Sequence, residues 1–130
     1  MKRILFGLLL ACAAALAHAQ GFPARPVTLL ITFPPGGPTD IAGRALAEAT
    51  AKYLGQPVVV ENRPGAAGQI AMTGVKNAAP DGLTLVMTPL VTVVTAPHVQ
   101  SLPYDPFADF APVAHTADFL FAFSMGPATP

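Results

Sequence analysis

The sequence predicts an α/β fold, in which helices flank a mostly parallel β-sheet. Short apolar runs rich in β-branched residues alternate along the chain with segments of helical periodicity, and glycine and proline clusters separate them. The composition agrees, because 52% of the 130 residues are hydrophobic and 11% are charged, which is too apolar for a disordered chain. The 15 prolines argue against a helical bundle. The length allows one domain or part of one.

The first predicted strand covers residues 27–33, whose run VTLLITF is almost continuously apolar, as is typical of a strand buried on both faces. It ends at residues 34–38, PPGGP, which no regular element crosses. A helix is expected next. Thr39 or Asp40 is expected to cap it, since either side-chain oxygen can accept a backbone N–H of the first turn.

This first helix is expected to run to about Leu54, where Gly55 ends it. Residues at helical spacing predict its buried face: Ala42, Leu46, Ala49 and Tyr53. Three charged residues at steps of four occupy the opposite face: Arg44, Glu48 and Lys52. We interpret that charged face as solvated surface.

The alternation then continues. A second strand is expected at 58–61, a turn at 62–68, a helix from about 69 to 78, and a third strand at 83–88. The second helix is expected to bury Ile70 or Met72, Val75 and Ala79. The order β-α-β-α-β calls for a parallel sheet with helices on its faces.

The pattern weakens beyond Pro89. Residues 91–96 fit a short helix or a strand, and residues 102–110 form an excursion bounded by prolines. Residues 111–115 and 119–124 are both predicted strands.

Residues 1–19 have the pattern of a signal peptide. A positive start, an apolar run at 4–17 and the small-x-small sequence Ala17-His18-Ala19 predict cleavage before Gln20 and export to the periplasm. An apolar helix of that length spans about 21 Å, which is short of a hydrocarbon core of about 30 Å, so no stable membrane insertion is expected after cleavage. An alternative is lipoprotein processing at Cys12, which the bulky Leu10 disfavours.

The charge and cysteine content exclude several classes of protein. Seven basic and seven acidic residues give zero net charge, and the basic residues are scattered, which argues against nucleic-acid binding. The single cysteine lies in the leader. Within residues 20–130, no disulfide and no zinc site built on thiolates is therefore expected.

Two glycine-containing loops are candidate ligand sites. Each follows a predicted strand, at the sheet edge where ligands of open α/β sheets bind. In the first, Gly36 and Gly37 precede a helix, so backbone amides and the helix dipole can attract an anion such as a carboxylate. The second, with Gly65 and Gly68, repeats this design. Taken by spacing alone, both loops fit ordinary turns better, because glycine-rich turns between a strand and a helix are common without ligands. Asp40 is compatible with either a cap or a ligand contact.

No catalytic or cofactor-binding motif is found. Neither loop has nucleotide-binding spacing, and there is no G-x-S-x-G elbow. A secreted hydrolase would need a nucleophile and a base, and the serines at 101 and 124 and the histidines at 98 and 115 form no recognisable pair; Ser101 and His98 are the residues to test for it. We therefore expect no enzyme activity, no cofactor and no metal site.

Four separated segments resemble, in order, the Bug family, the extracytoplasmic solute receptors of tripartite tricarboxylate transporters. They are 26–40 (PVTLLITFPPGGPTD), 60–68 (VENRPGAAG), 79–85 (APDGLTL) and 102–106 (LPYDP). The resemblance implies a periplasmic-binding-protein-like (type II) fold of two α/β domains that hold a small organic anion between them. It also implies delivery of the ligand to membrane permease subunits.

The resemblance further implies which residues bind the ligand. The substrate-binding residues would be Phe33, Pro34, Gly36, Gly37, Thr39 and Asp40, with Ala66, Ala67, Gly68, Thr88 and Thr92 as neighbours. This chain has Ala96-Pro97 where the family commonly has Asn-Pro, so the ligand's identity stays open.

The resemblance also bears on length and role. Family members continue into a second domain, so residues 20–130 are expected to be an incomplete first domain that presents one wall of the cleft. Two alternatives are a sensory ligand-binding module of a two-component system and a truncated remnant without function.

Overall fold

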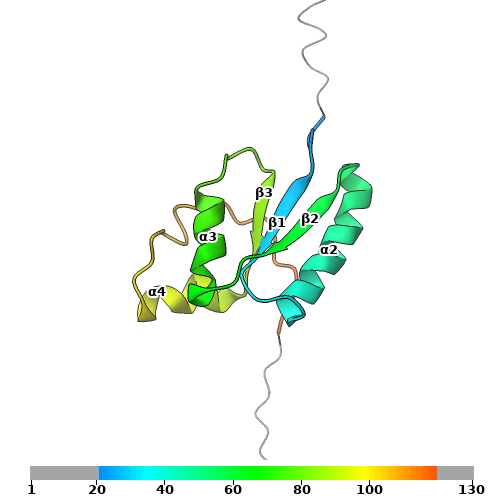
Figure 1. The fold of residues 1–130 in the computed structure, drawn as a ribbon. Helices are drawn as coiled ribbons and strands as arrows, with labels where there is room; N and C mark the ends of the chain where they lie inside the picture. The colour runs from blue at the N-terminus through cyan, green and yellow to red at the C-terminus, as the bar shows by residue number, and fades with distance from the viewer. Residues whose placement is uncertain (1–20, 120–130) are drawn as a thin grey trace, which may run out of the picture.

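A computed structural model describes residues 21–119. Its core is a three-stranded parallel sheet in the order β2-β1-β3, formed by β1 (Val27–Ile31), β2 (Val58–Asn62) and β3 (Thr84–Met87). Between the strands come α2 (Pro38–Leu54) and α3 (Gln69–Lys76), as Figure 1 shows, and the one-turn η1 (Ala66–Gly68) directly precedes α3. The predicted β-α-β-α-β order and parallel sheet are confirmed. The signal-peptide interpretation concerns residues outside the described range.

The three strands end together at one edge of the sheet. Leu29 is paired with Val60 on one side and with Leu85 on the other, and the pairing is parallel throughout. The carboxyl ends of the strands, the starts of α2 and α3, and the helical segment after β3 therefore all lie at the lower end of the sheet in Figure 1. This edge carries the loops that the sequence singled out.

The two long helices cover opposite faces of the sheet. A Cβ added at Gly43 of α2 would meet the Ile31 side chain, whereas one added at Gly74 of α3 would meet Leu30. Neighbouring residues of a strand point to opposite faces, so α2 and α3 enclose β1 from both sides. Val27, Leu29, Leu30 and Ile31 are accordingly at most 5% exposed, as expected for a strand buried on both faces.

The buried face of α2 differs from the predicted one. Gly43 and Ala47 face the sheet, while Leu46 is 39% exposed and Tyr53 is 91% exposed. Small residues pack here because the helix lies so close to β1 that a Cβ at position 43 would approach Ile31 Cδ1 to 2.7 Å. A larger residue on this face would push the helix away from the sheet. The predicted end of the helix is confirmed, since Gly55 caps it with φ +67°.

The second helix is only partly as predicted. Of the alternatives Ile70 and Met72, Met72 is the buried one, and Ile70 is 53% exposed. Val75 is half-buried, whereas Ala79 is exposed and lies beyond the helix. The helix also ends at Lys76, two residues before the predicted end.

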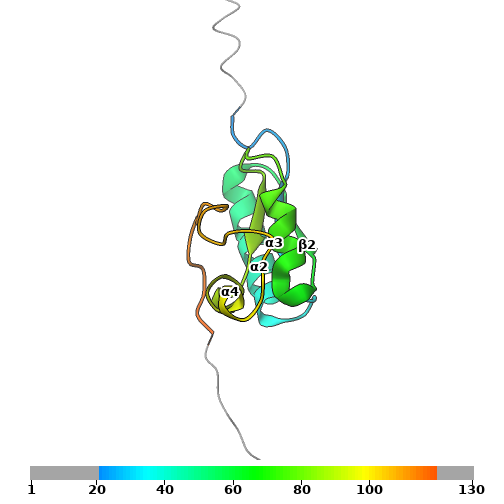
Figure 2. The ribbon, with the colours of Figure 1, turned by 90° about the vertical axis from the view of Figure 1, so that its left-hand side faces the viewer.

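The chain after β3 is helical and then irregular. The π-helical turn η2 (Val91–Thr95) runs into α4 (Ala96–Val99), which settles the open choice at 91–96 in favour of a helix. The following segment runs alongside the body of the fold (Figure 2). Lys76 Nζ holds it through Asp109 at 2.8 Å and the Pro103 carbonyl at 3.1 Å. Buried Tyr104 packs edge-on against Phe110.

Of the two strands predicted beyond residue 110, one is wrong and the other lies almost entirely outside the described residues. Residues 111–115 are exposed and have no regular structure, because no neighbouring strand pairs with them in the described sheet. The predicted strand at 119–124 lies outside the described residues except for its first position. Within the described range, no helix has the length and apolar character needed to span a bilayer.

Candidate functional site

The loop between β1 and α2 leaves the start of α2 uncapped by any side chain of the described chain. Gly37 is the N-cap residue and Pro38 occupies the first turn. The first helical bond runs from Ile41 N to Gly37 O, so the amides of Gly37, Thr39 and Asp40 precede it and have no acceptor inside the helix. The predicted capping by Thr39 or Asp40 is wrong. Proline starts the helix because its fixed φ suits the first position.

Asp40 acts on the loop instead of on its own helix. Its side chain is buried, and Oδ2 accepts the Gly36 amide at 2.9 Å. The Gly36 amide therefore has an internal partner and stabilises the loop. The amides of this helix end that have no acceptor among residues 21–119 are those of Gly37, Thr39 and Asp40, and we call them the open amides.

Two further side chains complete this network. Arg44 Nε donates to Asp40 Oδ2 at 3.0 Å, and Asn62 Nδ2 donates to Asp40 Oδ1 at 2.9 Å. Arg44 Nη2 also donates to Asn62 Oδ1 at 2.9 Å. The hydrogen bonds from Arg44, Gly36 and Asn62, in that order, lower the pKa of Asp40 to about 2. The carboxylate is thus ionised and both of its oxygens are occupied by internal donors.

Arg44 corrects one part of the sequence interpretation. Glu48 and Lys52 lie on the solvated surface, as expected, and form a loose pair at 3.9 Å. Arg44 is half exposed, yet it contributes to the network beneath the loop. The spacing of four residues from Asp40 to Arg44 was the available signal for this pair. Asn62 was missed because its partners lie on other elements.

The second loop forms a left-handed turn. Ala66, Ala67 and Gly68 have φ values of +46°, +53° and +95°. The two alanines are exposed, and Gly68 is buried against Thr92 and Thr32. A Cβ at position 68 would lie 2.9 Å from Thr92 Cγ2 and 3.1 Å from Thr32 Cβ. Only glycine fits this combination of positive φ and close contact.

Three threonines gather beneath this turn. Thr32 Oγ1 donates to Thr88 Oγ1 at 3.1 Å, which joins the ends of β1 and β3. Thr92 is 2% exposed, and its hydroxyl has no hydrogen-bond partner among residues 21–119. Thr32 was not predicted, although it directly follows β1 at the sheet edge. Its position connects the first loop to the threonine cluster.

The structure thus arranges the predicted site residues in two neighbouring groups. The first group surrounds the start of α2: Phe33, Pro34, Gly36, Gly37, Thr39 and Asp40. The second lies under and within the left-handed turn: Ala66, Ala67, Gly68, Thr88 and Thr92. Thr32 lies between them. Within the first group, Phe33 contributes its carbonyl to Asn62, and Thr39 and Asp40 have buried side chains.

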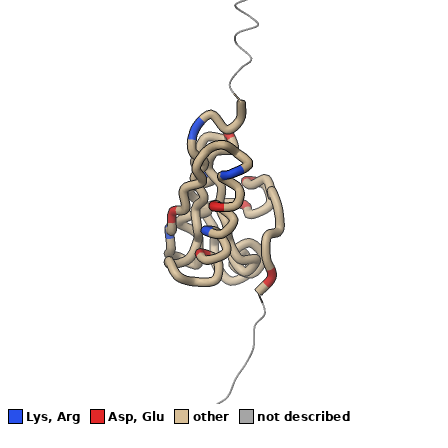
Figure 3. Tube along the Cα trace, turned by 90° about the vertical axis from the view of Figure 1, so that its right-hand side faces the viewer, with Lys and Arg blue, Asp and Glu red and all other residues tan. Residues whose placement is uncertain are grey.

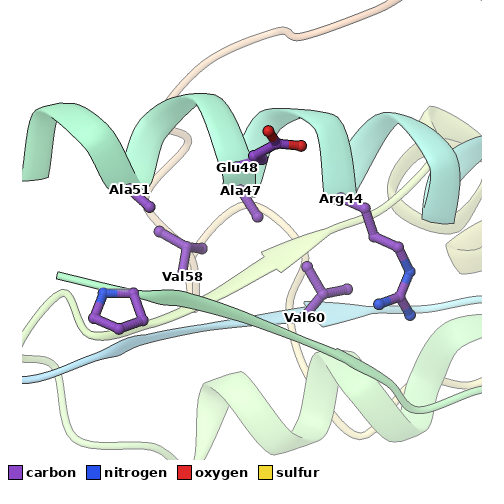
Figure 4. A pocket seen from close by; sticks show the side chains of 7 residues that line it. Arg44, Ala47, Glu48, Ala51, Val58 and Val60 are labelled. Atoms are coloured by element: carbon purple, nitrogen blue, oxygen red, sulfur yellow. The ribbon is translucent and has the colours of Figure 1, made fainter.

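Two open grooves lie away from these groups. One, of about 350 Å³, runs between α2 and the edge strand β2 and is lined by Arg44, Ala47 and Val60 among others (Figure 4). The other, of about 420 Å³, lies beside the segment after α4 and is lined by Gln100, Tyr104 and Phe107 among others. Apart from Arg44, neither contains a residue of the network or of the two groups.

Comparison with known sequences identifies relatives along most of the chain. The sequence profile of the family described as "Tripartite tricarboxylate transporter family receptor" matches residues 42–130. Protein BugT of Bordetella pertussis is 40% identical over 135 residues, covering 98% of this chain and 41% of that protein. The UPF0065 protein in the gbd 5' region of Cupriavidus necator is 38% identical over 121 residues, covering 93% and 37%. The chain therefore spans about two fifths of these relatives' lengths.

Solved structures share the fold. MatC from Rhodopseudomonas palustris with bound malate has a TM-score of 0.70 and 46% identity, covering 73% of this chain and 33% of that one. A structure described as a periplasmic transporter has a TM-score of 0.62 and 39% identity, covering 66% and 29%. The expected periplasmic-binding-protein-like fold is confirmed by these likenesses. Because the receptor profile matches more than half of the sequence, the chain belongs to the family of tripartite tricarboxylate transporter receptors, as its resemblance to the Bug proteins predicts.

Proposed function

We propose that this chain belongs to a periplasmic solute receptor that captures a small organic anion for a tripartite tricarboxylate-type transporter. The observation that carries the proposal is the uncapped start of α2 at the carboxyl end of β1. A helix start with free amides attracts a carboxylate through hydrogen bonds and through the positive end of the helix dipole. Membership of the receptor family supports the same function.

The charges around the loop are compatible with an anionic ligand. The negative charge of Asp40 lies in the first turn of α2, where it would repel an anion if it were unpaired. Arg44 offsets that charge at 3.0 Å, and Asn62 and Gly36 take up the remaining acceptor positions. On the α2 side of the molecule, basic and acidic residues are interspersed (Figure 3). Recognition would therefore depend on oriented amides more than on a basic patch.

Dicarboxylates are the class of ligand that we propose. MatC, whose structure contains malate, is 46% identical to this chain over the matched part. One carboxylate would bind the amides of Gly37 and Thr39, with the turn at Ala66–Gly68 as a neighbouring surface. The receptor role needs no catalytic group. The leader expected at residues 1–19 fits a periplasmic location.

Amide chemical shifts test this proposal directly. The uniformly labelled receptor, extended to the length of its relatives, is titrated with malate, succinate and adipate, and in parallel with the neutral diamide of malate. We expect the Gly37 and Thr39 amides to shift in a saturable manner with at least one dicarboxylate and not with the diamide, because only the carboxylate supplies negative charge. Shifts of equal size with the neutral diamide, or none with any dicarboxylate up to high millimolar concentration, would refute the proposal.

A further inference from the structure

The loop before α2 has few attachments of its own. From Phe33 to Gly37, after the Thr32 hydroxyl that is bonded to Thr88, the described hydrogen bonds engage the Phe33 carbonyl, the Gly36 amide and the Gly37 carbonyl. The Gly37 carbonyl accepts the first bond of α2 and belongs to the helix. The conformation of residues 33–36 therefore depends on what holds Phe33 and Gly36.

Both of these attachments lead to Asn62. Its Nδ2 donates to the Phe33 carbonyl at 3.1 Å and to Asp40 Oδ1 at 2.9 Å. The other oxygen of Asp40 accepts the Gly36 amide at 2.9 Å. One amide group at the end of β2 thus holds one end of the loop directly and the other through Asp40.

The chemistry of the site requires an amide at this position. Nδ2 supplies two protons to two acceptor oxygens, while Oδ1 accepts from Arg44 Nη2 at 2.9 Å. An aspartate of the same shape would place a second carboxylate against Asp40 and against a carbonyl oxygen. It would lose both donated bonds and add repulsion between like charges.

We infer that Asn62 is a positioning residue, which fixes the loop so that the open amides of Gly37 and Thr39 present themselves to a ligand. Asn62 does so from a neighbouring strand and without contacting the ligand. The inference rests on the proposed function as far as the ligand is concerned. Its structural half, the hold on the loop, can be measured without any ligand.

The test compares Asn62→Ala and Asn62→Asp with Glu61→Gln as matched control. Glu61 is the preceding residue of β2, and its side chain bonds Arg63 at 2.8 Å on the other face of the strand. Two quantities are measured: the hydrogen-exchange protection of the Gly36 amide without ligand, and the dissociation constant for the dicarboxylate that binds best. Both Asn62 variants should lose protection at Gly36, and affinity, by about tenfold, and the control should lose neither.

The pH profile separates positioning from a general structural role. Besides the carboxylate that Asn62→Asp introduces, the charged groups that face the site are Asp40 and Arg44 of α2. On β2 itself, Glu61 is paired with Arg63 at 2.8 Å, and the loop contributes only the Phe33 carbonyl. Two facing carboxylates share a proton when the pH is lowered, and the shared proton restores a donor toward Asp40. Asn62→Asp should therefore recover protection at Gly36 and affinity as the pH falls from about 8 to about 5, whereas Asn62→Ala should not.

The outcomes are distinct. Unchanged Gly36 protection in both Asn62 variants would overturn the inference, and so would recovery of Asn62→Ala at low pH. If Asn62→Ala does not fold, the pH profile of Asn62→Asp decides alone. If the wild type binds no dicarboxylate while both variants lose Gly36 protection, the hold of Asn62 on the loop stands and the proposed function fails.

Discussion

Asn62 Nδ2 and Asp40 Oδ1 lie 2.9 Å apart, so a hydrogen bond joins the end of β2 to the first turn of α2. The residues are 22 positions apart in sequence. The bond links the two β-α units at the edge of the sheet where both candidate loops lie. The first loop is therefore held by side chains of α2 and β2 as well as by its own backbone.

The pH dependence of stability reports on Asp40. Its pKa of about 2 in the folded state is below the ordinary 3.8, so its contribution to stability is present above pH 3.8 and is lost as the pH falls through about 2. Urea unfolding of the wild type and of Asp40→Asn should differ by a constant amount from about pH 8 to 5, and the difference should shrink between about pH 4 and 2. The lowered pKa values of Asp81, Asp105 and Asp109 affect both proteins and cancel. A difference that does not change with pH would contradict the network.

The turn at Gly68 should not tolerate a side chain. Gly68→Ala adds a methyl group 2.9 Å from Thr92 Cγ2 at a residue with φ +95°, so both packing and backbone strain oppose it. We expect the free energy of unfolding to fall by about 2–4 kcal/mol. Gly55→Ala is the matched control, since its φ is +67° with no atom within 4 Å of the added Cβ. Gly55→Ala should lower the free energy of unfolding by about 1 kcal/mol. Equal losses in the two variants would exclude close packing of Gly68 against Thr92.

The face of α2 that packs on the sheet can be tested by substitution. Gly43→Leu places a large side chain against Ile31, whose Cδ1 would lie 2.7 Å from the added Cβ, and should lower the free energy of unfolding by about 1–3 kcal/mol. Tyr53→Ser alters a side chain that is 91% exposed and should change it by less than about 0.5 kcal/mol. Urea unfolding measures both. A larger loss of stability in Tyr53→Ser than in Gly43→Leu would show that the face predicted from the sequence is the buried one.

Lys76 should hold the segment of residues 102–110 onto α3. Its Nζ reaches Asp109 at 2.8 Å and the Pro103 carbonyl at 3.1 Å. Lys76→Met should raise hydrogen exchange at the Phe107 and Ala108 amides, which the turn around Asp105 protects, and leave the sheet unchanged. Lys52→Met is the control, because its pair with Glu48 is long and exposed. Protection that persists in Lys76→Met would show that Tyr104 and Phe110 hold the segment by themselves.

The alternation of elements could be predicted from the sequence, because local signals define it. The apolar run in β1 and the glycine that ends α2 both act within a few residues of the chain. The buried face of α2 could not be predicted in the same way. Alanines of α2 occur on several sides of the helix, so the large residues Leu46 and Tyr53 decided which face was predicted to be buried. In the structure, the close approach of the helix to Ile31 requires the small Gly43 instead.

The candidate site, too, could be predicted only where neighbouring residues in the sequence define it. The glycine loops and their place at the sheet edge follow from the sequence, since each loop joins a strand to a helix. The roles of Asn62 and Thr32 could not be predicted from the sequence, because they depend on partners from other elements: Asp40 for Asn62, and Thr88 for Thr32. The strand predicted at 111–115 failed for a related reason, since a strand needs a neighbour that local sequence does not reveal.

The most direct measurement of the central claim closes the open end of α2 with a side chain. Gly37 has φ −79° and an added Cβ would meet only the Pro34 carbonyl at 3.6 Å, so a substitution fits. Gly37→Asp supplies a cap that takes up the free amides and repels anions, while Gly37→Ala adds the Cβ and leaves the amides open. In the dicarboxylate titration we predict that Gly37→Asp loses affinity by about tenfold or more while its helix is as stable as before, and that Gly37→Ala binds within about twofold of the wild type. Binding of a dicarboxylate by Gly37→Asp with wild-type affinity would contradict the account.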